Sequence, residues 1–396
     1  MKKILISGEY QANTGFSKVV ENIAKILKEE YEVTILDYSK SHGFVYRIDD
    51  MLVTGKSNSE NKFGTNIIIN LIEGYDFLFI INDIWNIDEM LTDIRMSGKK
   101  LPKIVIYFPI DATNHFAFWY KNLDIVDMVV TYTHFAKKVI LDAVSDKNTG
   151  FGNKLHIEEL EKKISIIPHG IDQNTLSIIP EKKELRRDLF KSKEYDDSFI
   201  ILNANRNQPR KKLDITLRAF KTFLDLGICK NSFLYLHSAI CDSHIDTYMY
   251  AKRLGILENV IFTQDYNKKN VMPSFSDKEM NFVYNACDVG INTSIGEGWG
   301  LCSFEHAYTG GVQIVPDHSA CSEIYTSDES EFIDSEAFIT QDFIMTIGEL
   351  PYYSSAASKI AKLSHETYRM YKRDKTINKF HNPQFHWSFQ IEIFHV

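Results

Sequence analysis

Two carboxylates and a glycine-rich loop stand together in the stretch INTSIGEGWGLCSFEHAYTGG. Glu297 lies in the loop, and Glu305 follows it about one turn into a helix that the pattern predicts from Leu301. Gly298 and Gly300 let backbone N–H groups approach a ligand closely, and a helix N-terminus adds unpaired donors with a partial positive charge. This arrangement suits the diphosphate of an activated sugar, with the two acids accepting hydrogen bonds from hydroxyl groups.

A second set of candidates follows the predicted strand SFIILN, in the loop NANRNQPRKKLD. Arg206 offers a planar fork to phosphate oxygens, and Lys211 offers a point charge. A run of charges can be a solvated face, but that is less expected directly after an apolar strand. We expect Arg210 and Lys212, in contrast, on the surface.

The segment EGWGLCSFEHAYTGG resembles the Glu-x7-Glu signature of the retaining nucleotide-sugar glycosyltransferases, in particular family 4 of the GT-B fold. The preceding segment SDKEMNFVYNACDVGINTS, with a capping box predicted at Ser276 and Glu279, is similar to that family as well. Arg206 and Lys211 look like the Arg-x4-Lys pair with which the family holds the donor diphosphate.

This resemblance implies an α/β fold of the GT-B type, with two Rossmann-like doubly wound domains facing across a cleft. The expected domains are residues 1–172, on the acceptor side, and residues 173–374, which would bind the donor. A C-terminal helix at about 375–396 would return to the first domain. The apolar strand, helix and strand that open the chain agree with a doubly wound sheet. The dinucleotide fingerprint Gly-x-Gly-x-x-Gly is absent, which disfavours a nicotinamide or flavin site.

The implied reaction moves a sugar from a UDP- or GDP-sugar to a hydroxyl of a glycan, lipid or protein-linked sugar, with retention at the anomeric carbon. Arg206, Lys211 and the helix start at Leu301 would neutralise the leaving diphosphate. Glu297 would bind sugar hydroxyls, and Glu305 the ribose hydroxyls. Enzymes of this fold generally need no divalent metal, and the sequence has no Asp-x-Asp motif. No cofactor is expected.

Other parts of the chain resemble the family less specifically. The segment ANTGFSKVV is similar to the family's first loop and would place Gly15 beside the donor diphosphate, although a simple helix-start glycine is the alternative. His318 and the residues up to Ser322 resemble the loop that closes on the nucleotide, and Thr263 to Tyr266 are weak candidates for the base site. His169 is expected in a turn where the chain crosses between domains, or in contact with ligand.

The strands YDFLFIIND and KIVIYFPID end in Asp83 and Asp111, and His115 follows. Ligands of open α/β sheets bind beyond the carboxyl ends of strands, so these residues are acceptor-side candidates, and Asp111 is included in the catalytic set. For both aspartates a helix-capping role is the alternative. Many family members carry a histidine near the position of Asp111, so this chain departs from the pattern there. Residues 38–62 are polar and expected to be irregular.

The composition of the chain narrows the classes of function that are expected. The chain has 396 residues, 44% hydrophobic and 25% charged, with a net charge of −8 and a pI near 5.9. A general nucleic-acid surface is not supported. No stretch approaches the roughly 20 apolar residues of a membrane span, which leaves peripheral contact open. MKKILISGEY is expected to be a strand and not a signal peptide, and the five cysteines are expected to be reduced thiols of a cytoplasmic protein.

Two other classes of function remain open from the sequence. One is a different enzyme on the same fold, such as a nucleotide-sugar epimerase or a phosphorolytic enzyme. The other is a non-catalytic nucleotide-sugar-binding subunit. The presence of Arg206, Lys211, Glu297 and Glu305 together argues against the last class, because a scaffold would not need all four.

Overall fold

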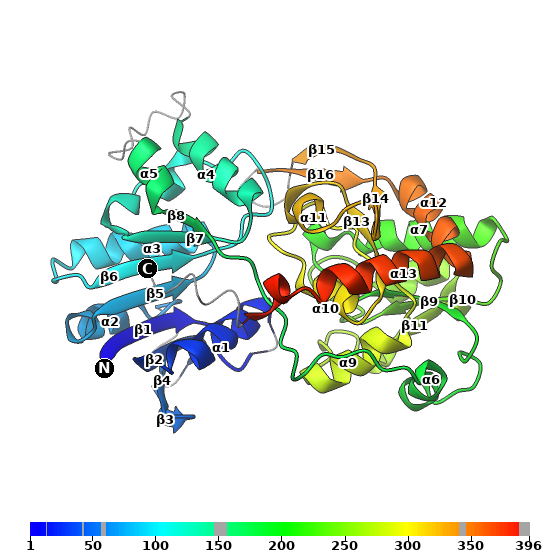
Figure 1. The fold of residues 1–396 in the computed structure, drawn as a ribbon, viewed down its shortest axis with the longest axis horizontal. Coiled ribbons are helices and arrows are strands. Elements are labelled where there is room, and N and C mark those ends of the chain that lie inside the picture. The colour runs from blue at the N-terminus through cyan, green and yellow to red at the C-terminus, as the bar shows by residue number, and fades with distance from the viewer. Residues whose placement is uncertain (13, 42, 57–60, 146–156, 340–345, 388–396) are drawn as a thin grey trace. The chain divides into compact units, whose positions relative to one another are not determined.

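The computed structural model describes residues 1–396 except 13, 42, 57–60, 146–156, 340–345 and 388–396. The chain divides into two compact units, coloured from blue to green and from green to red in Figure 1. Met1–Ile110, Asn114–His169 and Trp387 belong to the first unit. Asp111–Thr113 and Gly170–His386 belong to the second. The chain therefore crosses after His169, close to the boundary expected at residue 172.

The first unit is built on an eight-stranded sheet of order β3-β4-β2-β1-β5-β6-β7-β8, in which every pair is parallel except β3 with β4. The strands are β1 (Lys2–Gly8), β2 (Tyr31–Ser41), β3 (Val45–Ile48), β4 (Met51–Lys56), β5 (Phe77–Ile81), β6 (Lys103–Tyr107), β7 (Met128–Thr131) and β8 (Ile164–Ile166). The helices are α1 (Gly15–Leu27), α2 (Thr65–Leu71), α3 (Ile84–Met96), α4 (His134–Ser145) and α5 (Ile157–Lys163). This confirms the predicted α/β class.

The expectation that residues 38–62 are irregular is wrong. β2 continues to Ser41, and β3 and β4 form an antiparallel hairpin that extends the sheet beyond β2. β4 alternates buried and half-buried side chains, as a strand covered on one face does. β3 has only 4 residues and none of them is buried, so its sequence carries little signal of a strand.

The second unit has a six-stranded, all-parallel sheet of order β11-β10-β9-β12-β13-β14 and a separate antiparallel pair, β15-β16. The strands are β9 (Phe199–Asn203), β10 (Ser232–Leu236), β11 (Val260–Phe262), β12 (Val289–Ile291), β13 (Val312–Pro316), β14 (Ser330–Ile333), β15 (Ser335–Ile339) and β16 (Ile347–Pro351). The helices are α6 (Lys182–Phe190), α7 (Leu213–Asp225), α8 (Thr247–Leu254), α9 (Asp277–Ala286), α10 (Leu301–Tyr308), α11 (Ser319–Ile324), α12 (Tyr353–Ser364) and α13 (Glu366–Phe380). The capping box of α9 at Ser276 and Glu279 is confirmed.

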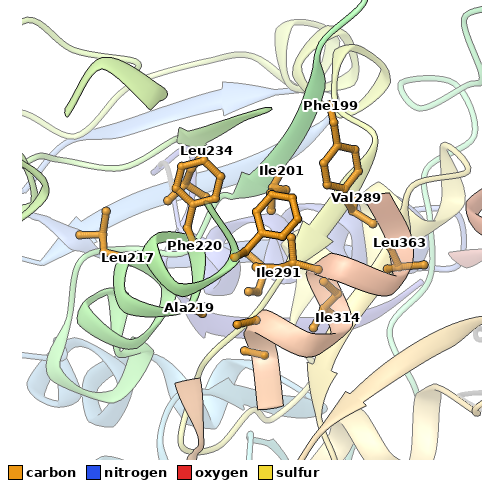
Figure 2. Close-up of a cluster of buried hydrophobic side chains, with 14 of the residues drawn as sticks. Phe199, Ile201, Leu217, Ala219, Phe220, Leu234, Val289, Ile291, Ile314 and Leu363 are labelled. Carbon is orange, nitrogen blue, oxygen red and sulfur yellow. The ribbon is translucent and has the colours of Figure 1, made fainter. Parts of the chain in front are cut away.

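A hydrophobic core fixes the strand that leads into the glycine loop. Helices α7 and α12 pack together, and Phe220 and Leu363 from them meet Ile201, Val289 and Ile291 of the sheet (Figure 2). Burying a side chain of this size contributes about 1.5–3 kcal/mol. Because Val289 and Ile291 are buried in this core, the end of β12 is fixed, and the glycine loop begins from a defined position.

The chain returns to the first unit after His386 and not from about residue 375. Helix α13 packs against α10, α12 and β13, and the second unit extends through His386. Buried Lys372 explains part of this, because its ammonium donates to the carbonyl of Ser330 at 2.9 Å. Only Trp387 of the described residues beyond α13 belongs to the first unit, and residues 388–396 lie outside the description.

Candidate functional site

The glycine loop between β12 and α10 is buried and tightly bonded to itself. Asn292 accepts from the amide of Ser294 at 2.9 Å, and the hydroxyl of Ser294 donates to the carbonyl of Gly296 at 2.7 Å. A Cβ atom on Gly296 would lie 1.9 Å from the carbonyl oxygen of Asp111, so only glycine fits there. Gly300 has a φ of 83°, the left-handed conformation from which α10 begins.

Glu297 and Lys211 form a buried ion pair at this loop. The ammonium of Lys211 lies 2.5 and 2.7 Å from the two carboxylate oxygens, and the side chains are 11% and 5% exposed for Lys211 and Glu297. Burial alone would raise the pKa of Glu297, but Lys211, Arg210 and the hydrogen bond from Asn292 lower it to about 2. Burial and the charge of Arg210 lower the pKa of Lys211. The carboxylate is therefore ionised at neutral pH.

Arg210 also belongs to this site, against the expectation that it lies on the surface. Its Nε is 3.2 Å from Asp111, its NH1 is 3.4 Å from Glu297, and the side chain is only 28% exposed. Lys212 is buried too, with its ammonium over the ring of Phe338, which corrects the second surface expectation. Arg210 and Lys211 lie in the short 3-10 turn η5 (Pro209–Lys211), and Lys212 follows it. Their partners Asp111, Glu297 and Phe338 are distant in the sequence, so the charge run alone does not reveal these contacts.

Arg206 takes a different place from its predicted partner Lys211. Its Nε donates to Asp242 at 2.7 Å, and its side chain is 50% exposed. Within the described residues the structure thus brings Lys211 and Arg210 to Glu297, but not Arg206. The Arg-x4-Lys spacing predicted Lys211 at this site together with Arg206. The arginine that contacts the carboxylate of Glu297 is Arg210.

Glu305 lies on α10, where the sequence analysis placed it, and is buried. The hydroxyl of Tyr284, on α9, donates to its carboxylate at 2.8 Å. The helix begins at Leu301, whose amide and those of the next two residues have no intrahelical acceptor. A Cβ on Gly300 would lie 3.6 Å from Cγ of Glu297, so the helix start and the Lys211–Glu297 pair are adjacent. Gly298 lies in the buried loop between them.

The segment at the start of α11 forms hydrogen bonds with the backbone of Glu297. The amide of Glu297 donates to the hydroxyl of Ser319 at 3.0 Å, and the amide of Ala320 donates to the carbonyl of Glu297 at 3.2 Å. Ser319 has a φ of 51°, an uncommon conformation for a serine. This is the segment that resembles a nucleotide loop. Its two hydrogen bonds fix the backbone of Glu297.

The acceptor-side candidates separate between the two units. Asp111 lies in the second unit, against Gly296 and Arg210, whereas Asp83 and His115 lie in the first. Asp83 stands at the N-cap position of α3 without a capping hydrogen bond from its side chain. His115 is buried in an aromatic group, 2.8 Å from the hydroxyl of Tyr120. Asp111 is thus the acceptor-side candidate that contacts the charged site.

Gly15 is the first residue of α1, directly after its N-cap, Thr14, whose hydroxyl accepts from the amide of Ser17 at 3.1 Å. His169, expected in a turn, is buried between the rings of Tyr107 and Tyr132. Burial lowers the pKa of His169 to about 3, so its imidazole is neutral.

Among the described residues, no group of three or more His, Cys, Asp or Glu side chains is placed to hold a metal ion. Among the same residues, no helix has both the length and the apolar character that crossing a bilayer requires.

The candidate site brings together cations, backbone amides and two carboxylates. Such a set can bind an anionic group next to a polyhydroxyl group.

No protein-family model and no curated protein sequence matches the chain. Similar solved structures exist, among them Anabaena HepE in complex with UDP and glucose, with 13% identity, a TM-score of 0.71, and coverage of 100% of this chain and 98% of HepE. OtsA in its apo form has 10% identity and a TM-score of 0.70, with 100% of both chains covered. Sucrose-phosphate synthase from Thermosynechococcus elongatus has 11% identity and a TM-score of 0.67, with 100% of this chain and 98% of that chain covered. At such identities the likeness establishes the fold, which is GT-B.

Proposed function

We propose that the protein is a retaining glycosyltransferase of the family 4 type, which transfers a sugar from a UDP- or GDP-sugar to a hydroxyl acceptor on a glycan, lipid or protein-linked sugar. The observation that carries the proposal is the buried Lys211–Glu297 pair beside the start of α10, on a GT-B fold. Further support comes from HepE, whose structure holds UDP and glucose. A cytoplasmic location is part of the same proposal.

The leaving diphosphate is the centre of the proposed mechanism. Negative charge grows on it as the glycosidic bond breaks, and groups fixed in advance around it stabilise that charge without reorganising. Lys211 and the first amides of α10 would provide such groups, and Arg206, half exposed and paired with Asp242 in the preceding loop, would add a second cation. Gly15 and Gly300 would allow close approach of the backbone. No metal is needed for this charge balance.

The carboxylates have separate roles in the proposal. Glu297 accepts hydrogen bonds from hydroxyl groups of the transferred sugar, and Glu305 accepts them from the ribose. Asp111, whose carboxylate reaches Arg210, lies next to the sugar end of the site. Asp83 and His115 are weaker acceptor-side candidates, because His115 is engaged by Tyr120.

Two alternatives use the same fold. A nucleotide-sugar epimerase or phosphorolytic enzyme would also bind the diphosphate, and a non-catalytic subunit would bind the donor without consuming it. The buried charges of Lys211 and Glu297 favour catalysis over mere binding, since ion pairs removed from water are costly to maintain without a role for them.

The decisive experiment has two stages. Thermal shifts with UDP, GDP and their sugar derivatives identify the donor, because a bound ligand stabilises the folded state by mass action. Release of the nucleotide diphosphate is then measured with and without acceptor fractions. Acceleration by an acceptor, with a new glycosidic bond in the product, is the expected result. Turnover that needs phosphate, or epimerisation without release, would instead identify the alternative enzymes.

A further inference from the structure

The hydrogen-bond acceptor positions of the Glu297 carboxylate are occupied in the structure. Oε1 accepts from Lys211 at 2.5 Å and from Asn292 at 2.9 Å, and Oε2 accepts from Lys211 at 2.7 Å with Arg210 at 3.4 Å. A carboxylate offers about four acceptor sites. A sugar hydroxyl can therefore bond to Glu297 only after one of these contacts is released.

Donor binding would release the contact between Lys211 and Glu297. Lys211 makes two of the four contacts, and its ammonium is the proposed partner of the diphosphate. When it turns away, Glu297 remains buried and loses its nearest positive charge. A buried carboxylate without a cation tends to take up a proton, and a protonated Glu297 would no longer bind sugar hydroxyls as strongly.

Arg210 is anchored by groups that donor binding leaves in place. Its guanidinium donates to the carbonyl of Gly296 and lies 3.4 Å from the hydroxyl of Ser294, while Nε contacts Asp111. Its own carbonyl accepts from the amide of Ile295 at 2.9 Å. Side chain and backbone thus clamp Arg210 to the loop that carries Glu297.

We infer that Arg210, oriented by Asp111, is a positioning residue that keeps Glu297 charged and in place while Lys211 engages the donor diphosphate. The inference rests on the proposed function for the role of Lys211, but the hold of Arg210 on Glu297 exists in the protein without ligand. It gives Asp111 the additional role of orienting Arg210.

The other titratable groups that face Glu297 do not supply a positive charge in place of Arg210. They come from α11 and its flanks: His318, Cys321 and Tyr325. Burial lowers the pKa of His318 and raises the pKa values of Cys321 and Tyr325, so all three are neutral at pH 7. Lys211 and Arg210 therefore supply the positive charge around this carboxylate.

The kinetic test is Arg210→Gln. We expect kcat to fall about tenfold or more, KM for the donor to change less than about threefold, and the acid limb of kcat to move up by about one pH unit or more. The limb of kcat/KM, which reports the free enzyme with Lys211 still on Glu297, should move less. Arg210→Lys should recover part of the pH shift, and Asp111→Asn should give a smaller shift in the same direction.

Arg187→Gln is the matched control, since Arg187 is an exposed arginine paired with Asp196, and it should leave all four quantities unchanged. Loss of kcat in Arg210→Gln without any shift of the acid limb would overturn the inference, because a merely structural arginine gives that result.

A second measurement uses no ligand and so separates this inference from the proposed function. With glutamate labelled at its carboxyl carbon, the NMR signal of Glu297, assigned by its loss in Glu297→Gln, is followed against pH. In Lys211→Gln the carboxylate should stay ionised at pH 7. In Lys211→Gln/Arg210→Gln its pKa should be higher than in Lys211→Gln by about one unit or more.

Equal pKa values in these two variants would overturn the inference. If the double variant does not fold, Lys211→Gln/Asp111→Asn is titrated, and a rise of about half a unit or more is expected over Lys211→Gln. No rise there would overturn the role of Asp111. The expected NMR result in a protein that turns over no nucleotide sugar would refute the proposed function alone.

Discussion

The two units share a parallel α/β design but differ in the candidate residues that follow their strands. In the second unit, Lys211 pairs with Glu297, and Arg210 lies between Glu297 and Asp111. In the first unit, His169 lies between tyrosine rings with a pKa of about 3, and His115 bonds Tyr120. The candidate residues that form ion pairs with one another therefore gather in the second unit.

The largest effect should follow removal of the central cation. Lys211→Ala should lower turnover of the donor by about a hundredfold or more, since loss of one group that stabilises a developing oxyanion costs about 2.7–4 kcal/mol. Arg206→Ala should cost less, because its side chain is half exposed and paired with Asp242. Initial rates of UDP or GDP release give the comparison.

Lys183→Ala is the control, because Lys183 is an exposed lysine paired with Asp197. Near-wild-type turnover in Lys211→Ala, with an intact fold by circular dichroism, would show that the ion pair of the second unit is structural and would remove the contrast between the units.

The sequence predicts the candidate site of the second unit because charged residues stand beside glycines there. Glu297, Glu305 and Lys211 came from motif spacing, and all three are placed around the start of α10. Arg210 was missed because its contacts with Asp111 and Glu297 join residues that are distant in the sequence. The first unit gave weaker signals, since a neutral histidine in an aromatic core, such as His169, has the same local sequence as a turn.

The fold was predictable where a local sequence pattern marks an element. Long apolar strands such as β5 and β6 follow directly from their composition, and the capping box fixes the start of α9. The β3–β4 hairpin was missed because β3 is a strand of only 4 residues with no buried side chain, which leaves little local signal. Which surface α13 packs on depends on tertiary contacts such as that of Lys372, which no local pattern encodes.

The two glutamates of the second unit should respond differently to neutralisation. Glu305→Gln should weaken binding of the bare nucleotide diphosphate, because a charge-assisted hydrogen bond to the ribose is worth about 1.5–3 kcal/mol. Glu297→Gln should leave that binding within about threefold and lower the turnover of the full donor. Calorimetric titration with UDP and GDP, beside steady-state kinetics, measures both. The reverse pattern would mean that the roles of the two acids are exchanged.

A smaller effect tests the neutral character of His169 in the first unit. The unfolded chain protonates His169 near pH 6.5, but the folded chain does so only near pH 3. The unfolded state therefore binds more protons in this window, and stability falls as the pH drops through it, by up to about 1.4 kcal/mol per unit. His169→Gln should flatten this dependence in urea unfolding measured from pH 7 to 4.

The exposed His365 supplies the control, since His365→Gln should leave the slope unchanged. Part of the slope should persist in His169→Gln, because burial also lowers the pKa of His306 to about 3 and that of His237 to about 4 in the second unit. An unchanged slope in His169→Gln would mean that this histidine is charged in the folded protein, and the contrast between the units would fail.

The smallest effect is expected from a chelator. In the proposed mechanism the charge of the leaving diphosphate is met by Lys211 and the amides at the start of α10, so a divalent cation is not required for its departure. Turnover in excess EDTA should stay within about twofold of the untreated rate. UDP or GDP release should be followed by chromatography, because a coupled assay could fail through its own metal-dependent enzymes. Loss of turnover that manganese or magnesium restores would show that the cations of the second unit do not suffice, and a metal-assisted leaving group would replace the charge balance proposed for Lys211.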